Sequence, residues 1–125
     1  MSQHSAIAAG AVSKEAAKQT ALAPVYALVA QDYAQDHVEI VLVDNGSTDD
    51  SVPFVRAAYP RVRVVEAGRN LGFAGGNNLG ARVATGDYLA LINNDAQADS
   101  HWLQALAEPL EAQPDVACTA SRILD

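Results

Sequence analysis

Three short polar segments of this 125-residue chain carry residue types that can bind a ligand. One begins at Asp44, after the apolar run 38–43, and another ends at Asp95, after the apolar run 88–92. Between them, residues 70–80 (NLGFAGGNNLG) form a glycine-rich turn that leads into a helix. Because an α/β sheet binds its ligand at the carboxyl ends of its strands, we expect these segments to form one site. A carboxylate flanked by amides suits a divalent cation that also holds a diphosphate.

Each segment also has a simpler interpretation. Asp44 precedes an Asn-Gly dipeptide, so one alternative is that its side chain closes an Asx turn and has no other role. Asp95, in the same way, can simply cap the turn after its strand. The glycine spacing does not match the dinucleotide fingerprint, and no Lys-Ser/Thr pair follows the glycines as in a phosphate-binding loop. A calcium loop starting at Asp44 fails, because Gly46 and Val55 occupy ligand positions. The histidines are dispersed, and no nucleophile is paired with a base.

The hydrophobic pattern predicts alternating helices and strands from about residue 24 onward. Apolar runs predict strands at 38–43, 62–65, 88–92 (a central strand) and 116–120. Helical spacing predicts helices at about 22–33, 50–59, 74–85 and 101–108. The expected helix ends are Pro24 in a first turn, a capping box of Ser47 and Asp50, Gly86 as a C-cap, and Pro109 as a stop or kink. This order predicts an α/β fold, a parallel sheet with helices on both faces.

Composition limits the class of protein. Half of the residues are apolar and 18 % are charged, which is typical of one globular domain. The net charge of −7 and the scattered basic residues argue against a nucleic-acid partner. The first twenty residues do not resemble a targeting signal and the apolar stretch 21–30 is too short to span a membrane, so we expect a cytoplasmic protein. Cys118 is expected to be a buried side chain in a reducing compartment.

In their order and spacing, the segments resemble the donor-binding half of family 2 glycosyltransferases, which have the GT-A (Rossmann-like) fold. The rhamnosyltransferase-like subgroup is the most similar. The resemblance runs from about Pro24 to Asp125 and rests on residues 38–49 (VEIVLVDNGSTD), 70–80, 86–95 (GDYLALINND) and Trp102-Leu103.

The resemblance implies roles for particular residues. Asp44 would bind the base or ribose of the donor, and Asn93-Asn94-Asp95 stands where the family carries its D-x-D motif. Asp95 would bind Mg²⁺ or Mn²⁺, which bridges to the diphosphate. The substrate-binding residues implied are Asp44, Asn45, Gly46, Ser47, Asn70, Gly72, Gly75, Gly76, Asn77, Asn93 and Asn94.

The reaction implied is inverting transfer of a sugar from a dTDP- or UDP-linked donor to a saccharide or lipid-linked acceptor, in cell-surface polysaccharide biosynthesis. No catalytic residue is assigned, because the general base of the family lies in a later motif than any in this chain. We therefore expect the chain alone to be inactive, as a truncated product. The alternatives are a nucleotide-sugar-binding module without catalysis, or a degenerate fragment that associates with other proteins through unpaired strand edges.

The N-terminal segment departs from the family pattern. The family opens with a strand of the type VSVIIPTYN, which residues 5–20 (SAIAAGAVSKEAAKQT) do not match. We expect residues 1–23 to be helical or disordered and residues 24–125 to form a partial, incomplete GT-A domain. Without the opening strand, its two neighbours would lose a row of backbone partners, which predicts marginal stability or self-association.

Overall fold

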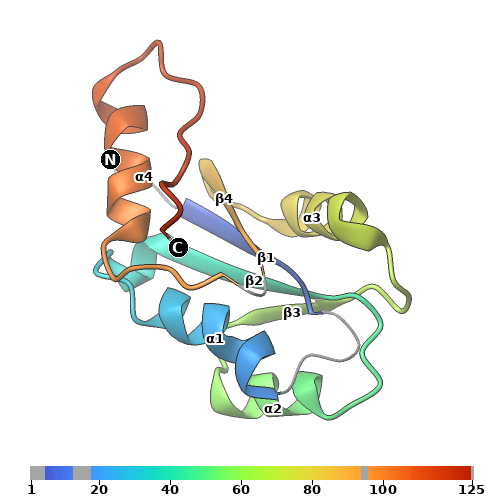
Figure 1. Ribbon diagram of the computed structural model, residues 1–125. Coiled ribbons are helices and arrows are strands. Elements are labelled where there is room, and N and C mark those ends of the chain that lie inside the picture. Colours follow the sequence, from blue (N-terminus) through green and yellow to red (C-terminus); the bar gives the residue numbers. More distant parts are fainter. Residues whose placement is uncertain (1–4, 13–17, 94–95, 125) are drawn as a thin grey trace.

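The computed structural model describes residues 5–12, 18–93 and 96–124, and it shows a parallel sheet between layers of helices (Figure 1). Over these described residues, the sheet has four strands in the order β3-β2-β1-β4. Their bounds are β1 (Ser5–Val12), β2 (Val38–Asp44), β3 (Arg63–Glu66) and β4 (Tyr88–Ile92). All three neighbouring pairs are parallel, which confirms the predicted α/β class.

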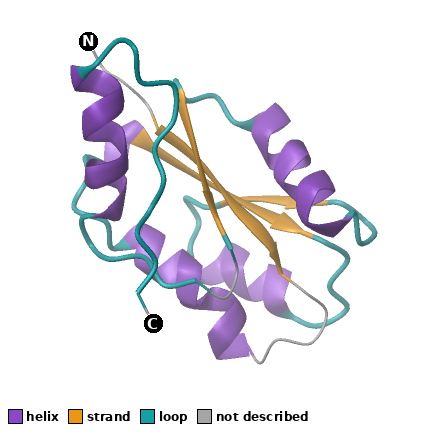
Figure 2. Ribbon diagram, turned by 45° about the horizontal axis from the view of Figure 1, so that its top comes forward, coloured by secondary structure: helices purple, strands orange, loops and turns teal. Residues whose placement is uncertain are grey.

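Helices cover both faces of the sheet (Figure 2). They are α1 (Lys18–Val29), α2 (Ser51–Ala58), α3 (Gly72–Val83) and α4 (Trp102–Ala112), with a short 3₁₀ helix η1 (Gln35–His37) before β2. Helix α3 packs over β1 and β2 on one face, while α1 and α2 lie on the other face. Among the described residues, no helix combines the length and hydrophobicity that a membrane crossing requires.

Strand β2 explains why both faces must be covered. Ile40 and Leu42 belong to a buried cluster with residues of α1, α2, β4 and α4. Val41 and Val43 are fully buried, and alternation along the strand points them toward α3. The uninterrupted apolar run is therefore what a strand buried on both faces requires.

Of the segment 1–23, predicted to be helical or disordered, residues 18–23 lie in α1 and residues 1–4 and 13–17 lie outside the described residues. Strand β1 corrects the expectation for residues 5–12. Its residues pair with β2 from Ser5 opposite Val38, and with β4 from Ser5 opposite Tyr88. Small residues and Gly10 give this segment a low intrinsic strand propensity. A strand between two others, however, forms hydrogen bonds along both edges, and this tertiary context outweighs propensity. The inner edges of β2 and β4 are thus paired, which removes the reason given for marginal stability and self-association.

The expected domain boundary after residue 23 falls inside α1. This helix begins at Lys18, so Pro24 lies in its interior rather than in its first turn. Pro109 likewise lies inside α4, which continues to Ala112. A proline removes one backbone hydrogen bond. Packing compensates here, since Pro24 is fully buried in the core and Leu103 and Ala107 bury one face of α4.

Other expected elements differ at their ends. The residue before α2 is Asp50 and its side chain forms no cap, while the Ser47 N–H bonds Asp44, so the capping box is absent. Helix α3 starts at Gly72 and is followed by Ala84, not Gly86, as C-cap.

The segment 116–120 is a loop rather than a strand, and Cys118 is exposed rather than buried. Two side-chain bonds hold this region on α4 instead: Thr119 to the Leu106 carbonyl, and Trp102 to Ser121. Strand β4 is consequently an edge strand of the described sheet, not a central one. Leu89 and Leu91 are each 48 % exposed, since α3 lies over β1 and β2.

Candidate functional site

The strand order brings the predicted polar segments to one edge of the sheet. From β1 the chain runs outward through β2 to β3, and it then crosses back to place β4 on the other side of β1. In α/β sheets such a reversal of strand order marks the ligand-binding crevice, outside the carboxyl ends of the strands. Asp44 ends β2 and Asn93 follows β4, so both lie at this edge.

Asp44 is held firmly at the end of β2. The residue is 4 % exposed, and its Oδ1 accepts a hydrogen bond from the Ser47 N–H at 3.2 Å. Its carbonyl oxygen accepts from the Ala67 N–H at 2.9 Å, just beyond β3. This side-chain bond reaches the N–H three residues on rather than two, so it is not the Asx turn that we considered as a simpler interpretation, but it does fix the direction of the carboxylate.

Asn45 joins the end of β2 to the glycine-rich turn. Its Nδ2 donates to the carbonyl oxygen of Gly72 at 3.1 Å, and its Oδ1 accepts from the Leu71 N–H at 3.2 Å. The residue is buried. Both ends of its amide group are thus engaged within the protein, a role that neighbouring residues in the sequence do not indicate.

Two glycines shape the same junction. Gly46 has a φ of +87°, and a Cβ there would lie 3.2 Å from the backbone Cα and C atoms of Arg69. Gly72, the first residue of α3, has a φ of +73°, and its N–H donates to Asn70 Oδ1 at 2.9 Å. Residues that carry a Cβ rarely adopt such φ values, so the backbone requires glycine at both positions.

Helix α3 turns Gly76, Asn77 and Gly80 inward. Within the described part of the chain, Asn77 Oδ1 and Ser47 Oγ are buried atoms without a hydrogen-bond partner. Buried polar atoms are nearly always paired, so these two are candidates to bind a ligand N–H or O–H group. Glycine at position 75 avoids a steric clash, because a Cβ there would lie 2.9 Å from Leu71 Cβ.

The structure leaves the predicted metal ligand undescribed. Asn93 is exposed and its carbonyl oxygen accepts from the Ala96 N–H at 3.2 Å, whereas Asn94 and Asp95 lie outside the described residues. Across residues 5–12, 18–93 and 96–124, no three His, Cys, Asp or Glu side chains gather closely enough to hold a metal ion. The expectation that Asp95 binds a divalent cation together with ligand phosphates therefore stays a prediction.

Gln31 is a buried polar residue that the sequence reasoning missed. It follows α1, and its side chain bonds Asp99 and Leu103, which are 68 and 72 residues away. No local pattern marks such a residue, because its partners are distant in the sequence.

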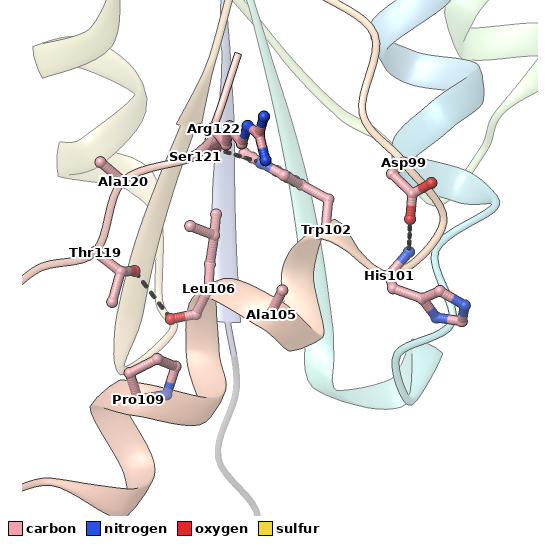
Figure 3. Close-up of a pocket in the computed structure, with 10 residues that line it drawn as sticks. All are labelled: Asp99, His101, Trp102, Ala105, Leu106, Pro109, Thr119, Ala120, Ser121 and Arg122. Carbon is pink, nitrogen blue, oxygen red and sulfur yellow. Dashed lines mark hydrogen bonds between the residues drawn. The ribbon is translucent and has the colours of Figure 1, made fainter. Parts of the chain in front are cut away.

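A hollow of about 460 Å³ lies elsewhere, between α4 and the C-terminal segment (Figure 3). Trp102, Leu106 and Arg122 are among the residues that line it. The Trp102 Nε1–H donates to Ser121 Oγ at 2.7 Å across it. None of the predicted site residues lines this hollow.

The sheet order and the placement of polar segments at its switch point define a GT-A-like α/β domain. Residues 15–123 match the family model Glycosyl transferase family 2, and the chain therefore belongs to this family. It is 32 % identical over 78 residues to Glycosyltransferase GlyG of Streptococcus pneumoniae, a match covering 60 % of this chain and 26 % of that protein. It is 35 % identical over 88 residues to the Uncharacterized glycosyltransferase YibD of Escherichia coli, covering 66 % and 25 % respectively.

Solved structures show the same fold. The mannosyltransferase PcManGT from Pyrobaculum calidifontis, in complex with GDP-Man and Mn²⁺, superposes with a TM-score of 0.78 and 26 % identity. That match covers 93 % of this chain and 34 % of PcManGT. TarS 1–349 of S. aureus, in complex with UDP, has a TM-score of 0.72 at 18 % identity, covering 86 % of this chain and 32 % of that one. The chain thus spans about a quarter to a third of the length of these proteins.

Proposed function

We propose that this chain forms the nucleotide-sugar-binding part of an inverting glycosyltransferase, which transfers a sugar to a saccharide or lipid-linked acceptor. The observation that carries the proposal is the convergence, at the switch point of the sheet, of the ends of β2 and β4 and the start of α3. Membership of family 2 and the nucleotide complexes of PcManGT and TarS support it.

Within this proposal, the residues of the site divide into three groups. Asp44, Ser47 and Asn77 offer buried oxygen atoms to the base and ribose. Asn70, Gly72 and Gly76 shape the pocket near the sugar and diphosphate, together with Asn93 and Asn94. Asn45, Gly46 and Gly75 hold the β2 end, the glycine turn and α3 in register, as their contacts indicate.

Asp95 is the proposed ligand of Mg²⁺ or Mn²⁺. The bound cation would act as a Lewis acid that stabilises negative charge on the departing nucleoside diphosphate. The chain has a net charge of −7 and its basic residues are scattered, so we expect a divalent cation, rather than a cluster of basic side chains, to neutralise the diphosphate. PcManGT was solved with Mn²⁺, which supports a divalent metal.

Finer features of the proposal rest on the sequence resemblance. They are a dTDP- or UDP-linked donor, similarity to rhamnosyltransferases, a role in cell-surface polysaccharide biosynthesis and a cytoplasmic location. A binding panel of dTDP, UDP and GDP would test the choice of base, with tighter binding of dTDP or UDP than of GDP expected.

Isothermal titration calorimetry tests the proposed function. We expect UDP or dTDP to bind in the presence of Mn²⁺ and to bind much more weakly in EDTA. Asp95→Ala should abolish the metal-dependent part, and Asp44→Ala should weaken binding with and without metal. Asp115→Ala is the matched control, because Asp115 is an exposed carboxylate after α4 and should change neither value. Equal affinities with Mn²⁺ and EDTA would contradict the proposal.

A further inference from the structure

The hollow between α4 and the C-terminal segment has an aromatic wall (Figure 3). Trp102 packs partly against the core cluster and also lines the hollow. Its Nε1–H donates to Ser121 Oγ at 2.7 Å, so the polar edge of the indole is already bonded within the protein. What the indole offers to the hollow is therefore apolar ring surface, next to the apolar side chains of Leu106 and Pro109.

Hydrogen-bonding groups also line the hollow. Thr119 Oγ1 donates to the Leu106 carbonyl oxygen at 2.9 Å and keeps lone pairs that can accept. Ser121 Oγ accepts from Trp102, so the Ser121 hydroxyl keeps its hydrogen to donate. Asp99 adds carboxylate oxygens, and Arg122 adds the N–H donors of its guanidinium group. The hollow thus combines an apolar surface with both donors and acceptors.

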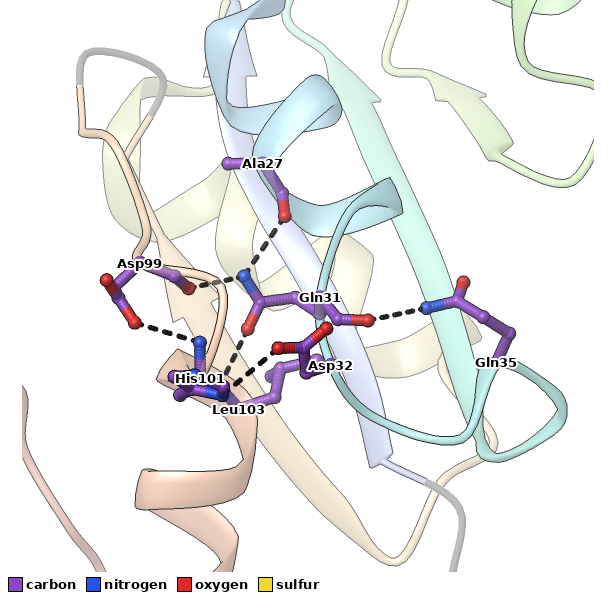
Figure 4. A network of polar contacts seen from close by, with 7 residues as sticks. All are labelled: Ala27, Gln31, Asp32, Gln35, Asp99, His101 and Leu103. Atoms are coloured by element: carbon purple, nitrogen blue, oxygen red, sulfur yellow. Dashed lines mark hydrogen bonds and ion pairs between the residues drawn. The ribbon is translucent and has the colours of Figure 1, made fainter.

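The wall of the hollow at the start of α4 is held by buried hydrogen bonds (Figure 4). Gln31 is only 5 % exposed. Its Nε2 donates to the carbonyl oxygen of Asp99 at 2.6 Å, and its Oε1 accepts from the Leu103 N–H at 2.9 Å. Asp99 Oδ1 in turn accepts from the His101 N–H at 2.9 Å. The backbone of Trp102 lies between these anchored residues and is fixed without a ligand, which lowers the entropy cost of binding one.

We propose that this hollow binds a saccharide. A pyranose ring has an apolar face of C–H groups that packs on an aromatic ring, and its hydroxyl groups both donate and accept hydrogen bonds. The indole of Trp102 suits the C–H face, and the polar groups of Thr119, Ser121, Asp99 and Arg122 suit the hydroxyls. The volume of about 460 Å³ lies within the range of small-molecule sites, about 300–1,000 Å³.

Other classes of ligand suit this lining less well. A purely apolar ligand would cover the polar groups of Thr119, Asp99 and Arg122 without giving them partners, which costs free energy. An anion such as a phosphate would meet the carboxylate of Asp99. None of the residues assigned to the nucleotide-sugar site lines the hollow, so the proposal does not depend on that function.

The fluorescence of the single tryptophan measures binding directly, because Trp102 lines the hollow. The probes are methyl α-glucopyranoside, methyl α-mannopyranoside and maltose, without nucleotide or metal. The control ligands are sorbitol, which has hydroxyl groups but no ring, and cyclohexanol, which has a ring but one hydroxyl group. Selective excitation of tryptophan follows the titration, and saturation-transfer NMR repeats it.

We expect at least one of the three sugars to change the emission saturably and to receive saturation from the protein, and neither control ligand to do so at equal concentration. Absence of both signals with all three sugars would overturn the proposal. An equal response to sorbitol or to cyclohexanol would also overturn it, because the combination of ring face and hydroxyl groups would then not be what binds.

The matched pair Ala105→Phe and Gln104→Phe locates the binding. Both residues are exposed on α4, but Ala105 lines the hollow and Gln104 does not. Ala105→Phe should fill the hollow and abolish the saturable response, whereas Gln104→Phe should bind as the wild type does. Equal affinities of the wild type and Ala105→Phe, or equal losses in both variants, would overturn the proposal.

A second pair tests the hollow without adding volume and replaces the first if Ala105→Phe does not fold, as judged by circular dichroism. Arg122→Gln removes a charged donor that lines the hollow, and Arg82→Gln removes an exposed arginine of α3 that does not. We expect Arg122→Gln to weaken sugar binding about tenfold, as loss of hydrogen bonds to a charged group does, and Arg82→Gln to leave it unchanged. Unchanged affinity in Arg122→Gln would show that this lining does not hold the sugar.

Discussion

Replacing Gly46 by alanine should destabilise the protein for two separable reasons. The φ of +87° lies in the left-handed region, where a Cβ costs about 1–2 kcal/mol. The new Cβ would also lie 3.2 Å from Arg69 Cα and C and 3.4 Å from the Asn70 nitrogen. These are backbone atoms, so the glycine turn must move, and overpacking of this kind typically costs about 1–3 kcal/mol.

Gly68→Ala is the matched control. Gly68 has a φ of +75°, similar to that of Gly46, but a Cβ there would meet no atom within 4 Å. The control therefore measures conformational strain alone, reduced by the smaller entropy of the unfolded alanine chain, about 0.4–1 kcal/mol. We expect Gly68→Ala to cost about 0.5–1.5 kcal/mol and Gly46→Ala about 2–4 kcal/mol.

Urea denaturation monitored by circular dichroism measures both variants. With an m-value of about 2 kcal/mol/M, a loss of about 2–4 kcal/mol lowers the midpoint by about 1–2 M. The two variants should have equal m-values, because neither changes the surface buried on folding. Equal losses within about 0.5 kcal/mol would refute the reasoning that the β2 end and the glycine turn are in contact.

Other predictions concern the core, the C-terminal segment and a tyrosine. Leu28 is fully buried, so Leu28→Ala should cost about 2–5 kcal/mol in the same urea assay, whereas Tyr26→Ala, on the exposed side of α1, should cost less. Ser121→Ala removes the acceptor of the Trp102 Nε1–H and should change the fluorescence of the single tryptophan, with a stability loss of about 0.5–1.5 kcal/mol. Unchanged emission would contradict the bond. Burial, with a hydrogen bond to Tyr26, raises the pKa of Tyr59 to about 12. The folded state then keeps a proton that the unfolded state loses near pH 10, so stability should fall between about pH 10 and 12. The absorbance of tyrosinate should show one titration step near pH 12, and Tyr59→Phe should abolish this step.

Local patterns in the chain were enough to predict much of the fold. Strands β2 and β4 and helix α3 were expected within one or two residues of their observed ends. Burial on both faces produces the apolar run before Asp44, and backbone conformations with positive φ require glycine at position 46, after β2, and at position 72, where α3 starts. Such requirements act on neighbouring residues, so they are visible in the order of residues alone.

Features that depend on distant partners were not predictable in this way. Ser5–Val12 is a strand because β2 and β4 offer backbone groups on both of its sides, although its small side chains and Gly10 favour no strand. Pro24 and Pro109 remain inside helices because packing replaces the lost bonds.

The site shows the same division. The types and positions of Asp44, Asn70 and Asp95 indicate a ligand site through motif spacing. The bonds of Asn45 to the glycine turn and of Gln31 to Asp99 follow only from the folded arrangement. Each bond joins segments that are far apart in the chain, where hydrogen-bonding groups meet only after the sheet and its helices have packed.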